Sequence, residues 1–539
     1  MTRLVLTICF VFTTLFSLMA QSNHPNRITG ECIVRLAENE NIPSFLRQLQ
    51  TNQRTKSNIQ YIRPLGKKHN IHAISFDESQ MHADDMLQLL LSQRQVLSAQ
   101  FNYRVDTRAT PDDPFYEFQW HMDLIGMPEV WDISTGGLTP QGDTIVVAIL
   151  DSGFDLNHPD LIPNIWRNHA EIPDDGIDND NNGYIDDYSG WNFLEQIPEH
   201  RVTAHGTQVS GLLGARGDNG LGVTGVNWNI KLMLLNTKDV NSIVEAYEYV
   251  IAQRELYNAT DGEEGAFIVA TNASFGIDRT YCSSVPVWEG MYDLMGEVGV
   301  LTGAGTSNST YNVEDEGDVP SDCASDFILT VLNTTFDDQK NASSAFGTTS
   351  IDMGAPGQGS YTLDLNNQYD SFGGNSAAAP HLTGAIAMLY SIPCDSIAAN
   401  AKRNPKTTAL VIRDILLRAV DPVEALSSFT ATGGRLNVAN AVEIIQETCG
   451  GTTAPLDVIR IYPNPSTEFL RVEYETPGFS DYRFRVVNAL GQTVIKDTVF
   501  PPQFGFKQYQ IDVRHLAAGT YFFVIDKGLN IEALPFVKM

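Results

Sequence analysis

The apolar stretch at residues 144–150 constrains the fold of this chain more than any other segment. It reads Thr-Ile-Val-Val-Ala-Ile-Leu and is rich in β-branched residues. A run of this length and composition predicts a parallel strand that is buried on both faces. Asp151 follows at once, and open α/β sheets build their sites at the carboxyl ends of their strands. The sequence therefore predicts an α/β domain with a carboxylate at that edge of the sheet.

Two further segments supply groups that can work with this carboxylate. His205 precedes small and apolar residues, which predict a packed helix beginning at the histidine. Ser376 opens a similar run, with Pro380 expected near the first turn, where a missing amide proton costs little. A serine there lies at the positive end of a buried helix. Asp151, His205 and Ser376 thus supply the acid, base and nucleophile of a serine hydrolase.

The order of these groups and the residues around them resemble the subtilisin-like proteases, or subtilases. The motifs are Leu-Asp-Ser-Gly at 150–153, His-Gly-Thr-Gln-Val-Ser-Gly at 205–211 and Gly-Asn-Ser-Ala-Ala-Ala-Pro-His at 374–381. The resemblance implies a doubly wound parallel sheet, and it covers roughly residues 111–447. It also implies that Ser274, Phe275 and Gly276 pair with an extended peptide, and that Asn308 stabilises the oxyanion.

The nucleophile segment departs from the family pattern at Asn375, where threonine is usual, and at Ala377, where methionine is usual. One alternative is therefore a catalytically impaired surface binding protein on a subtilase scaffold, although all three triad side chains are retained. Another is an esterase with the same triad, although the peptide-pairing segment favours peptides. The main expectation is a secreted serine endopeptidase that forms an acyl-enzyme.

Several residues near the triad have simpler interpretations. Asp155, His158 and Asp160 follow the predicted strand in a polar loop, so solvated or turn roles are expected for them. His381 is expected to pack on the buried helix and to be structural.

An acidic insert between Asp151 and His205 resembles a calcium loop. Residues 174–187 alternate acidic and amide side chains around a glycine, as an EF-hand loop does. Ser189 stands at the twelfth position instead of glutamate, so an EF-hand domain is not expected. A merely solvated acidic turn is the alternative. The expected Ca²⁺ ligands are Asp178, Asp180, Asn182, Tyr184 and Asp186.

Composition and charge agree with a secreted enzyme of several domains. The chain has 539 residues and 42% hydrophobic content, enough for two or three domains with a sizeable core. Its net charge of −30 argues against nucleic acid as a partner, because a polyanion would be repelled. No stretch after the leader is long and apolar enough to span a membrane. Residues 1–20 predict a signal peptide.

The remaining organisation follows from the resemblance. Residues 21–108 resemble a propeptide, an α+β domain that assists folding and transiently inhibits the enzyme, with processing expected near residues 107–110. The peptidase domain is expected at residues 109–449. Family-like positions imply disulfides that join Cys282 to Cys323 and Cys394 to Cys449, leaving Cys32 single.

The last part of the chain, residues 450–539, predicts a linker and a small β-sandwich. It resembles the C-terminal sorting domain of the type IX secretion system, which implies that machinery as a partner and export through the periplasm and outer membrane. A generic binding sandwich is the alternative. The motifs are Tyr-Pro-Asn-Pro at 462–465, Asn-Ala-Leu-Gly at 488–491, Leu-Ala-Ala-Gly-Thr-Tyr at 516–521 and Phe-Val-Lys at 536–538.

Overall fold

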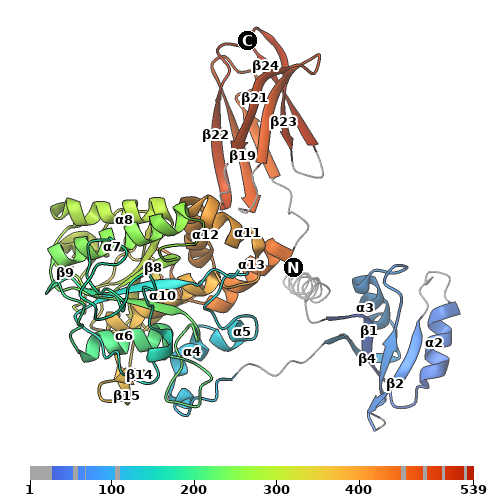
Figure 1. The fold of residues 1–539 in the computed structure, drawn as a ribbon. Helices are drawn as coiled ribbons and strands as arrows, with labels where there is room; N and C mark the ends of the chain where they lie inside the picture. Colours follow the sequence, from blue (N-terminus) through green and yellow to red (C-terminus); the bar gives the residue numbers. More distant parts are fainter. Residues whose placement is uncertain are drawn as a thin grey trace. The chain divides into compact units, whose positions relative to one another are not determined.

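The chain divides into two compact units in the computed structural model, Met1–Thr107 and Arg108–Met539 (Figure 1). The structure describes residues 27–51, 59–66, 68–103, 110–450, 457–477, 482–500, 504–526 and 531–539. The expected signal peptide and part of the expected linker lie outside the described residues. Of the helices that the structure describes, none has the length and apolar content of a membrane span.

The first unit is a small α+β domain, as predicted. Its antiparallel sheet has the order β2-β3-β1-β4. The strands are β1 (Arg27–Leu36), β2 (Gln60–Gly66), β3 (Ile71–Ser75) and β4 (Val96–Tyr103), and the helices are α2 (Ile42–Thr51) and α3 (Ala83–Leu91). Alternate β1 residues Cys32, Val34 and Leu36 are buried in one cluster with residues from both helices. The period-2 pattern of β1 therefore gives the sheet one covered face.

The second unit is built on a nine-stranded sheet of order β16-β17-β13-β12-β10-β8-β5-β7-β6. Every neighbouring pair is parallel except β16 with β17. The strands are β5 (Val146–Asp151), β6 (Trp191–Asn192), β7 (Lys231–Asn236), β8 (Ile268–Ala273), β10 (Leu301–Gly305), β12 (Ile328–Thr334), β13 (Met353–Pro356), β16 (Asp421–Pro422) and β17 (Gly434–Arg435).

Both faces of this sheet are covered by helices, which explains the unbroken apolar run in the sequence. All residues of β5 are buried. Val147 and Ile149 join one core with α6 (Ala204–Gly214), α10 (Asn375–Leu389), α12 (Pro405–Arg418) and α13 (Val438–Gly450). Val146, Ala148 and Leu150 join the other core with α7 (Val240–Ala259) and α8 (Pro286–Val298). The predicted doubly wound α/β architecture is confirmed.

Shorter elements surround the sheet and shape its loops. They are η1 (Tyr116–Phe118), α4 (Trp120–Leu124), α5 (Met127–Trp131), η2 (Ile162–Asn164), β9 (Ile277–Asp278), η3 (Cys282–Ser284), α9 (Val313–Glu316), β11 (Asp318–Val319), β14 (Ser360–Asp364), β15 (Gln368–Phe372), α11 (Asp395–Arg403) and η4 (Glu424–Leu426).

The C-terminal part is all β, as predicted. One sheet has the order β18-β19-β22 and the other β21-β20-β23-β24, with antiparallel pairing throughout. The strands are β18 (Asp457–Tyr462), β19 (Phe469–Pro477), β20 (Tyr482–Asn488), β21 (Thr493–Phe500), β22 (Phe504–Asp512), β23 (Gly519–Asp526) and β24 (Ile531–Lys538). Val472 and Ile511 of the first sheet share a core with Phe484, Phe523 and Phe536 of the second, so the two sheets form a sandwich.

Two disulfides are present, and both predicted pairings are confirmed. Cys282 bonds to Cys323, with Cα atoms 5.1 Å apart, and Cys394 bonds to Cys449, with Cα atoms 5.6 Å apart. Cys32 is buried and unbonded.

Removal of the Cys282–Cys323 bond should destabilise the second unit. The bond closes a loop with a sequence separation of 41 residues, and such cross-links typically contribute about 2–4 kcal/mol by restricting the unfolded chain. We expect the double Cys282→Ser/Cys323→Ser variant to unfold at a lower denaturant concentration, as followed by tryptophan fluorescence. An unchanged midpoint would contradict this role.

Candidate active site

The acid and the base of the predicted triad form a hydrogen-bonded pair. Asp151 ends β5 and is buried, whereas His205 is the second residue of α6 and is partly exposed. Nδ1 of His205 lies 2.8 and 2.9 Å from the two carboxylate oxygens of Asp151. The backbone N–H of Ser152 also donates to this carboxylate, at 2.6 Å. This arrangement keeps the proton on Nδ1 and leaves Nε2 with a free lone pair in the neutral imidazole.

The environment of His205 makes it a stronger base than an ordinary histidine. Burial by itself would lower the pKa of His205, but the hydrogen bond and the negative charge of Asp151 outweigh burial and raise that pKa. The ring of Phe372 packs edge-on against the imidazole at 5.4 Å between centroids, which restricts its orientation. Nε2 of His205 therefore accepts a proton more readily than an ordinary imidazole does.

Ser376 lies in the first turn of α10, and a proline shapes its surroundings. Pro380 lies inside the helix, further along than the first-turn position that the sequence suggested. Because proline has no N–H, the helix cannot satisfy the carbonyl of Ser376. The Ser274 hydroxyl donates to that carbonyl at 3.1 Å, and the Ser376 hydroxyl donates to the carbonyl of Ser274 at 3.3 Å. The two serines are thus cross-linked by reciprocal hydrogen bonds.

The side chain of Asn308 is held by the residue before the nucleophile. Asn308 follows β10 and is exposed. Its Oδ1 accepts from the backbone N–H of Asn375 at 2.8 Å and from Nδ2 of Asn375 at 3.1 Å. With Oδ1 occupied in this way, Nδ2 of Asn308 remains available as a donor. A Cβ on Gly374 would come within 2.8 Å of that Oδ1, so this position requires glycine.

Asn375 is fully engaged although it departs from the family pattern. It is buried, and its Nδ2 donates to the carbonyl of Ser307 at 2.7 Å. Its Oδ1 accepts from the N–H of Asn333 at 2.7 Å and from the hydroxyl of Ser344 at 2.8 Å. Both ends of this buried amide are hydrogen-bonded, as buried polar groups usually are. Asn375 therefore holds the segment that carries Asn308 in place.

Two cavities meet along the segment Ser274–Gly276. One, of about 360 Å³, contacts Asp151 and His205 and has apolar walls. Its apolar lining residues are Val240, Ile243, Phe275, Ile277 and Trp288. The other, of about 80 Å³, contacts Ser376 and Asn308. The acid–base pair and the nucleophile therefore lie on either side of the segment expected to pair with a peptide.

The three residues near the triad that were expected to have solvated or turn roles differ in how deeply they are buried. Asp155 has the predicted turn role, because its carboxylate accepts from the N–H of Asn157. The expectation of solvation is wrong for His158 and Asp160, which are both fully buried. Asp160 accepts from Val223 and from a side-chain amide on the same loop, and burial raises its pKa to about 7. The loop that contains Asn219 and Val223 covers the loop of Asp160. The polar sequence around Asp160 gave no sign of this burial.

His381 is buried on α10, as predicted. Its Nδ1 lies 2.7 Å from the carbonyl of Ala377, and its Nε2 lies 2.7 Å from Nδ1 of His121. Burial lowers its pKa to about 4, so it stays neutral and serves packing.

The acidic insert brings three carboxylates close enough to hold one metal ion. Carboxylate oxygens of Glu171, Asp178 and Asp180 lie within 4.8 Å of one another. Glu171, which the sequence analysis did not include, is buried and accepts from the N–H groups of Asn179, Asp180 and Asp186. The loop is thus folded around Glu171, and a set of carboxylate oxygens suits a hard cation such as Ca²⁺.

The other expected ligands point elsewhere. The Asp186 carboxylate accepts from the N–H groups of Asp175 and Gly176. Oδ1 of Asn182 accepts from the N–H of Tyr184, whose ring packs against Trp191, Phe193 and Tyr249. A second group of possible ligands, Asp322 with Cys282 and Cys323, is unsuitable because both cysteines are in a disulfide.

Comparison with known families agrees with this geometry. Residues 142–442 match the subtilase family, and residues 460–534 match the secretion system C-terminal sorting domain. The chain belongs to the subtilase family. The sorting domain indicates export, with release or attachment at the cell surface.

Individual relatives are distant. Subtilisin-like protease 1 of Plasmodium berghei is 26% identical over 363 residues, which cover 62% of this chain and 54% of the relative. A thermophilic serine proteinase of Bacillus sp. (strain AK1) is 23% identical over 345 residues, 64% of this chain and 72% of the relative. A solved protease structure from Pseudoalteromonas arctica has a TM-score of 0.45 and 19% identity over 62% of this chain and 99% of that one. The chain spans about half the length of the Plasmodium relatives.

Replacement of Asp151 should change the pH dependence of the site. In Asp151→Asn, His205 loses the charge and hydrogen bond that raise its pKa, so the acid limb of kcat/KM should move to lower pH. The maximum kcat should fall by about 10⁴, as it does when a triad aspartate is replaced. Steady-state hydrolysis of a peptide p-nitroanilide, measured against pH, gives both effects. Asp155→Asn, a nearby control, should leave the acid limb in place; an unmoved limb in Asp151→Asn would contradict the assignment.

Proposed function

We propose that this chain is a secreted serine endopeptidase that hydrolyses peptide bonds of proteins. The observation that carries the proposal is the Asp151–His205 pair beside the segment Ser274–Gly276, whose first residue is cross-linked to Ser376. Acyl transfer requires a base, a nucleophile and a donor for the oxyanion. This site offers a histidine with a raised pKa, a serine at a helix N-terminus and an anchored amide.

In the proposed reaction, Ser376 turns from the carbonyl of Ser274 towards Nε2 of His205 when substrate binds. Catalytic hydrogen bonds often tighten only in such complexes. His205 takes the hydroxyl proton as Oγ attacks the carbonyl carbon, and Asp151 stabilises the imidazolium. Nδ2 of Asn308 donates to the oxyanion, a contribution worth about 10²–10³ in rate in related enzymes. His205 then protonates the leaving amine, and water hydrolyses the acyl-enzyme by the same route.

The substrate is proposed to bind as an extended strand along Ser274, Phe275 and Gly276. Main-chain pairing of this kind is independent of sequence, and the flanking cavities select side chains. The apolar cavity of about 360 Å³ would receive a hydrophobic side chain of the substrate.

The alternative of a non-catalytic binding protein rests on Asn375 and Ala377. The hydrogen bonds of Asn375 argue against this alternative, because they keep Asn308 oriented as an oxyanion donor. A site that has lost catalysis would not require that orientation. Ester hydrolysis by the same groups would be a side activity.

Two other parts of the chain have proposed roles in maturation and export. The α+β unit of residues 27–103 would act as a transient inhibitor of the peptidase, and the limits 21–108 and 109–449 stay predictions. The C-terminal sandwich would be recognised by the type IX secretion machinery, in keeping with its match to a sorting domain.

Ser376→Ala should abolish both activity and labelling. We expect the activated wild type to cleave casein and to react with a fluorophosphonate probe, and the variant to do neither, because the probe bonds to the nucleophilic oxygen. Ser343→Ala, the same change at an exposed serine outside the site, is the matched control and should still be labelled. Folded, processed wild type that takes up no probe would contradict the proposal and favour the binding scaffold.

Calcium is proposed to bind at Glu171, Asp178 and Asp180. A ligand at 100 times its Kd adds about 2.7 kcal/mol to the free energy of unfolding, so calcium should raise the thermal midpoint and chelation should lower it. Asp178→Asn should reduce this calcium increment, measured by differential scanning calorimetry. Asp186→Asn removes a carboxylate that points elsewhere and should retain the increment. Equal loss in both variants would contradict the assignment.

A further inference from the structure

The small cavity beside the nucleophile carries two carboxylates. It has a volume of about 80 Å³ and is lined by Ser376, Asn308, the segment Ser274–Gly276, Asp278 and Asp318. Because it touches both the nucleophile and the oxyanion donor, it is the place where the side chain just before the scissile bond would enter. This inference rests on the proposed function and concerns which side chain enters.

The backbone places the two aspartates opposite each other in one ladder. Strands β9 and β11 form a two-stranded antiparallel ladder in which Asp318 is directly opposite Asp278. Directly opposed residues project from the same face of a ladder, and like charges in that arrangement are destabilising. The ladder has only two residue pairs, so it has few other interactions that could offset the repulsion between the carboxylates. A cation between them would remove that repulsion.

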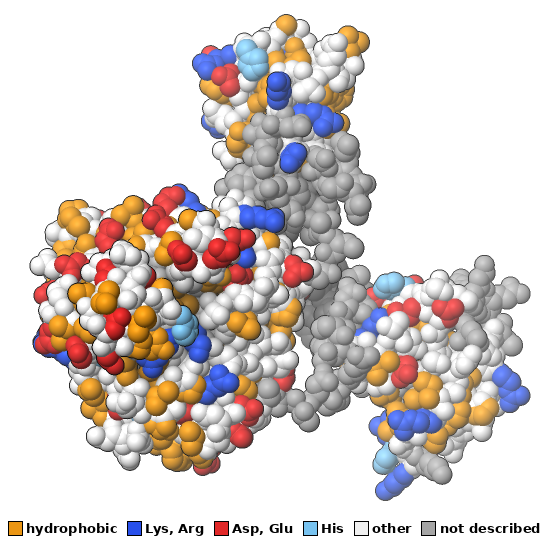
Figure 2. Space-filling model, viewed as in Figure 1, with side chains coloured by type: hydrophobic (Ala, Val, Ile, Leu, Met, Phe, Trp, Pro, Cys, Tyr) orange, Lys and Arg blue, Asp and Glu red, His pale blue; other side chains and the backbone are white. Residues whose placement is uncertain are grey.

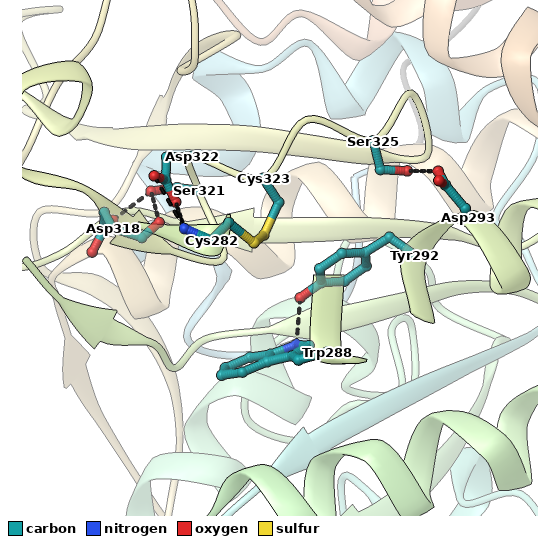
Figure 3. Close-up of a disulfide and its surroundings, with 9 residues drawn as sticks. All are labelled: Cys282, Trp288, Tyr292, Asp293, Asp318, Ser321, Asp322, Cys323 and Ser325. Carbon is teal, nitrogen blue, oxygen red and sulfur yellow. Dashed lines mark hydrogen bonds between the residues drawn. A yellow bond between two sulfur atoms is a disulfide. The ribbon is translucent and has the colours of Figure 1, made fainter. Parts of the chain in front are cut away.

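Asp318 is rigidly held and only 2% exposed. Its Oδ1 accepts from the hydroxyl of Tyr311 at 2.9 Å, and its Oδ2 accepts from the N–H of Ser307 at 3.0 Å and from the hydroxyl of Ser321. Figure 3 shows Asp318 beside Ser321, on the loop that the disulfide to Cys282 ties down. All three donors are neutral, so the carboxylate is oriented but its charge is not balanced.

No cationic side chain among the described residues forms an ion pair with either carboxylate. The nearest in sequence, Arg279, forms its ion pair with Glu316 at 2.5 Å and stacks on the Tyr311 ring at 4.7 Å, and it interacts with Asp278 only by charge attraction beyond ion-pair distance. Burial raises the pKa of Asp318 to about 6, against the opposing effect of its hydrogen bonds. A buried carboxylate without an ion pair is costly, and Asp318 has hydrogen bonds but no ion pair with a cation of the described residues.

We propose that Asp318, with Asp278 at the rim, makes this cavity selective for a lysine or arginine immediately before the scissile bond. Ammonium and guanidinium groups form strong charge-assisted hydrogen bonds with carboxylates. An aspartate in the same kind of pocket gives trypsin its preference for basic residues. The net charge of −30, with acidic side chains spread over the visible face of the large domain (Figure 2), would also attract cationic peptides.

The chain contains a fitting sequence of its own. Arg108 belongs to the expected processing segment of residues 107–110, most of which lies outside the described residues. Cleavage after Arg108 by the enzyme itself would leave Ala109 as the new N-terminus, which sequencing of the mature protein would detect.

The test uses peptide p-nitroanilides that differ only in the residue before the cleaved bond: arginine, lysine, leucine or glutamate. We expect kcat/KM for arginine or lysine to exceed that for leucine by about ten- to a hundredfold, as for one charge-assisted bond. Asp318→Asn should reduce this ratio at least tenfold. Asp322→Asn, the same change on the same loop but outside the cavity, should leave the ratio unchanged. The wild-type ratio should also fall as the pH drops below about 6, where Asp318 becomes protonated.

The outcomes separate this inference from the proposed function. If fluorophosphonate labels Ser376 and leucine is nevertheless preferred to arginine, the inference fails and the function stands. If arginine is preferred but Asp318→Asn keeps the ratio, Asp318 is not the selecting group. If nothing is labelled or cleaved, the function itself fails. If Asp318→Asn does not fold, the wild type is labelled with fluorophosphonate in the presence of benzamidine, which carries a cationic amidinium group. Benzamidine must slow the labelling of Ser376 if the cavity binds cations, and unchanged labelling would overturn the inference.

Discussion

The carboxyl edge of the parallel sheet is the constraint on which the rest of the structure depends. Adjacent strands β5, β8 and β10 end there: Asp151 is the last residue of β5, Ser274 follows β8, and the turn that carries Asn308 follows β10. Because both faces are covered by helices, polar groups can meet a substrate only where the strands stop. Helices α6 and α10 pack together on one face, and their first turns deliver His205 and Ser376 to that same edge.

Close approach of the backbone makes this edge possible. A Cβ on Gly206, next to the base, would come within 2.1 Å of the carbonyl of Gly153. The helix of the base can therefore lie against the end of the acid's strand only with glycine there. Pro380 contributes by a different route. Because it has no N–H, the carbonyl of Ser376 accepts a hydrogen bond from Ser274 instead. Local backbone chemistry thus decides where the catalytic groups meet.

Buried polar groups in this site are of two kinds. Asn375 has donors and acceptors for both ends of its amide and stiffens the oxyanion segment. Asp318 has hydrogen bonds but forms no ion pair among the described residues. The first kind stabilises the free enzyme, whereas the second leaves electrostatic free energy that a cationic ligand can recover. The same edge therefore holds both the proposed catalytic residues and the carboxylate that we propose distinguishes between substrates.

The sequence by itself determined the architecture and the order of the triad, because buried strands, helix starts and family motifs are local patterns. The cysteine pairs were implied only by the resemblance to the family, and the structure shows them. The sequence could not reveal Asp318, which is an unremarkable acidic residue until ladder pairing sets it opposite Asp278 beside Ser376. Nor could it show that Glu171 joins Asp178 and Asp180 while Asp186 turns away, or that a second loop buries Asp160. These outcomes depend on contacts between residues far apart in the chain, and only the tertiary structure decides which of them meet.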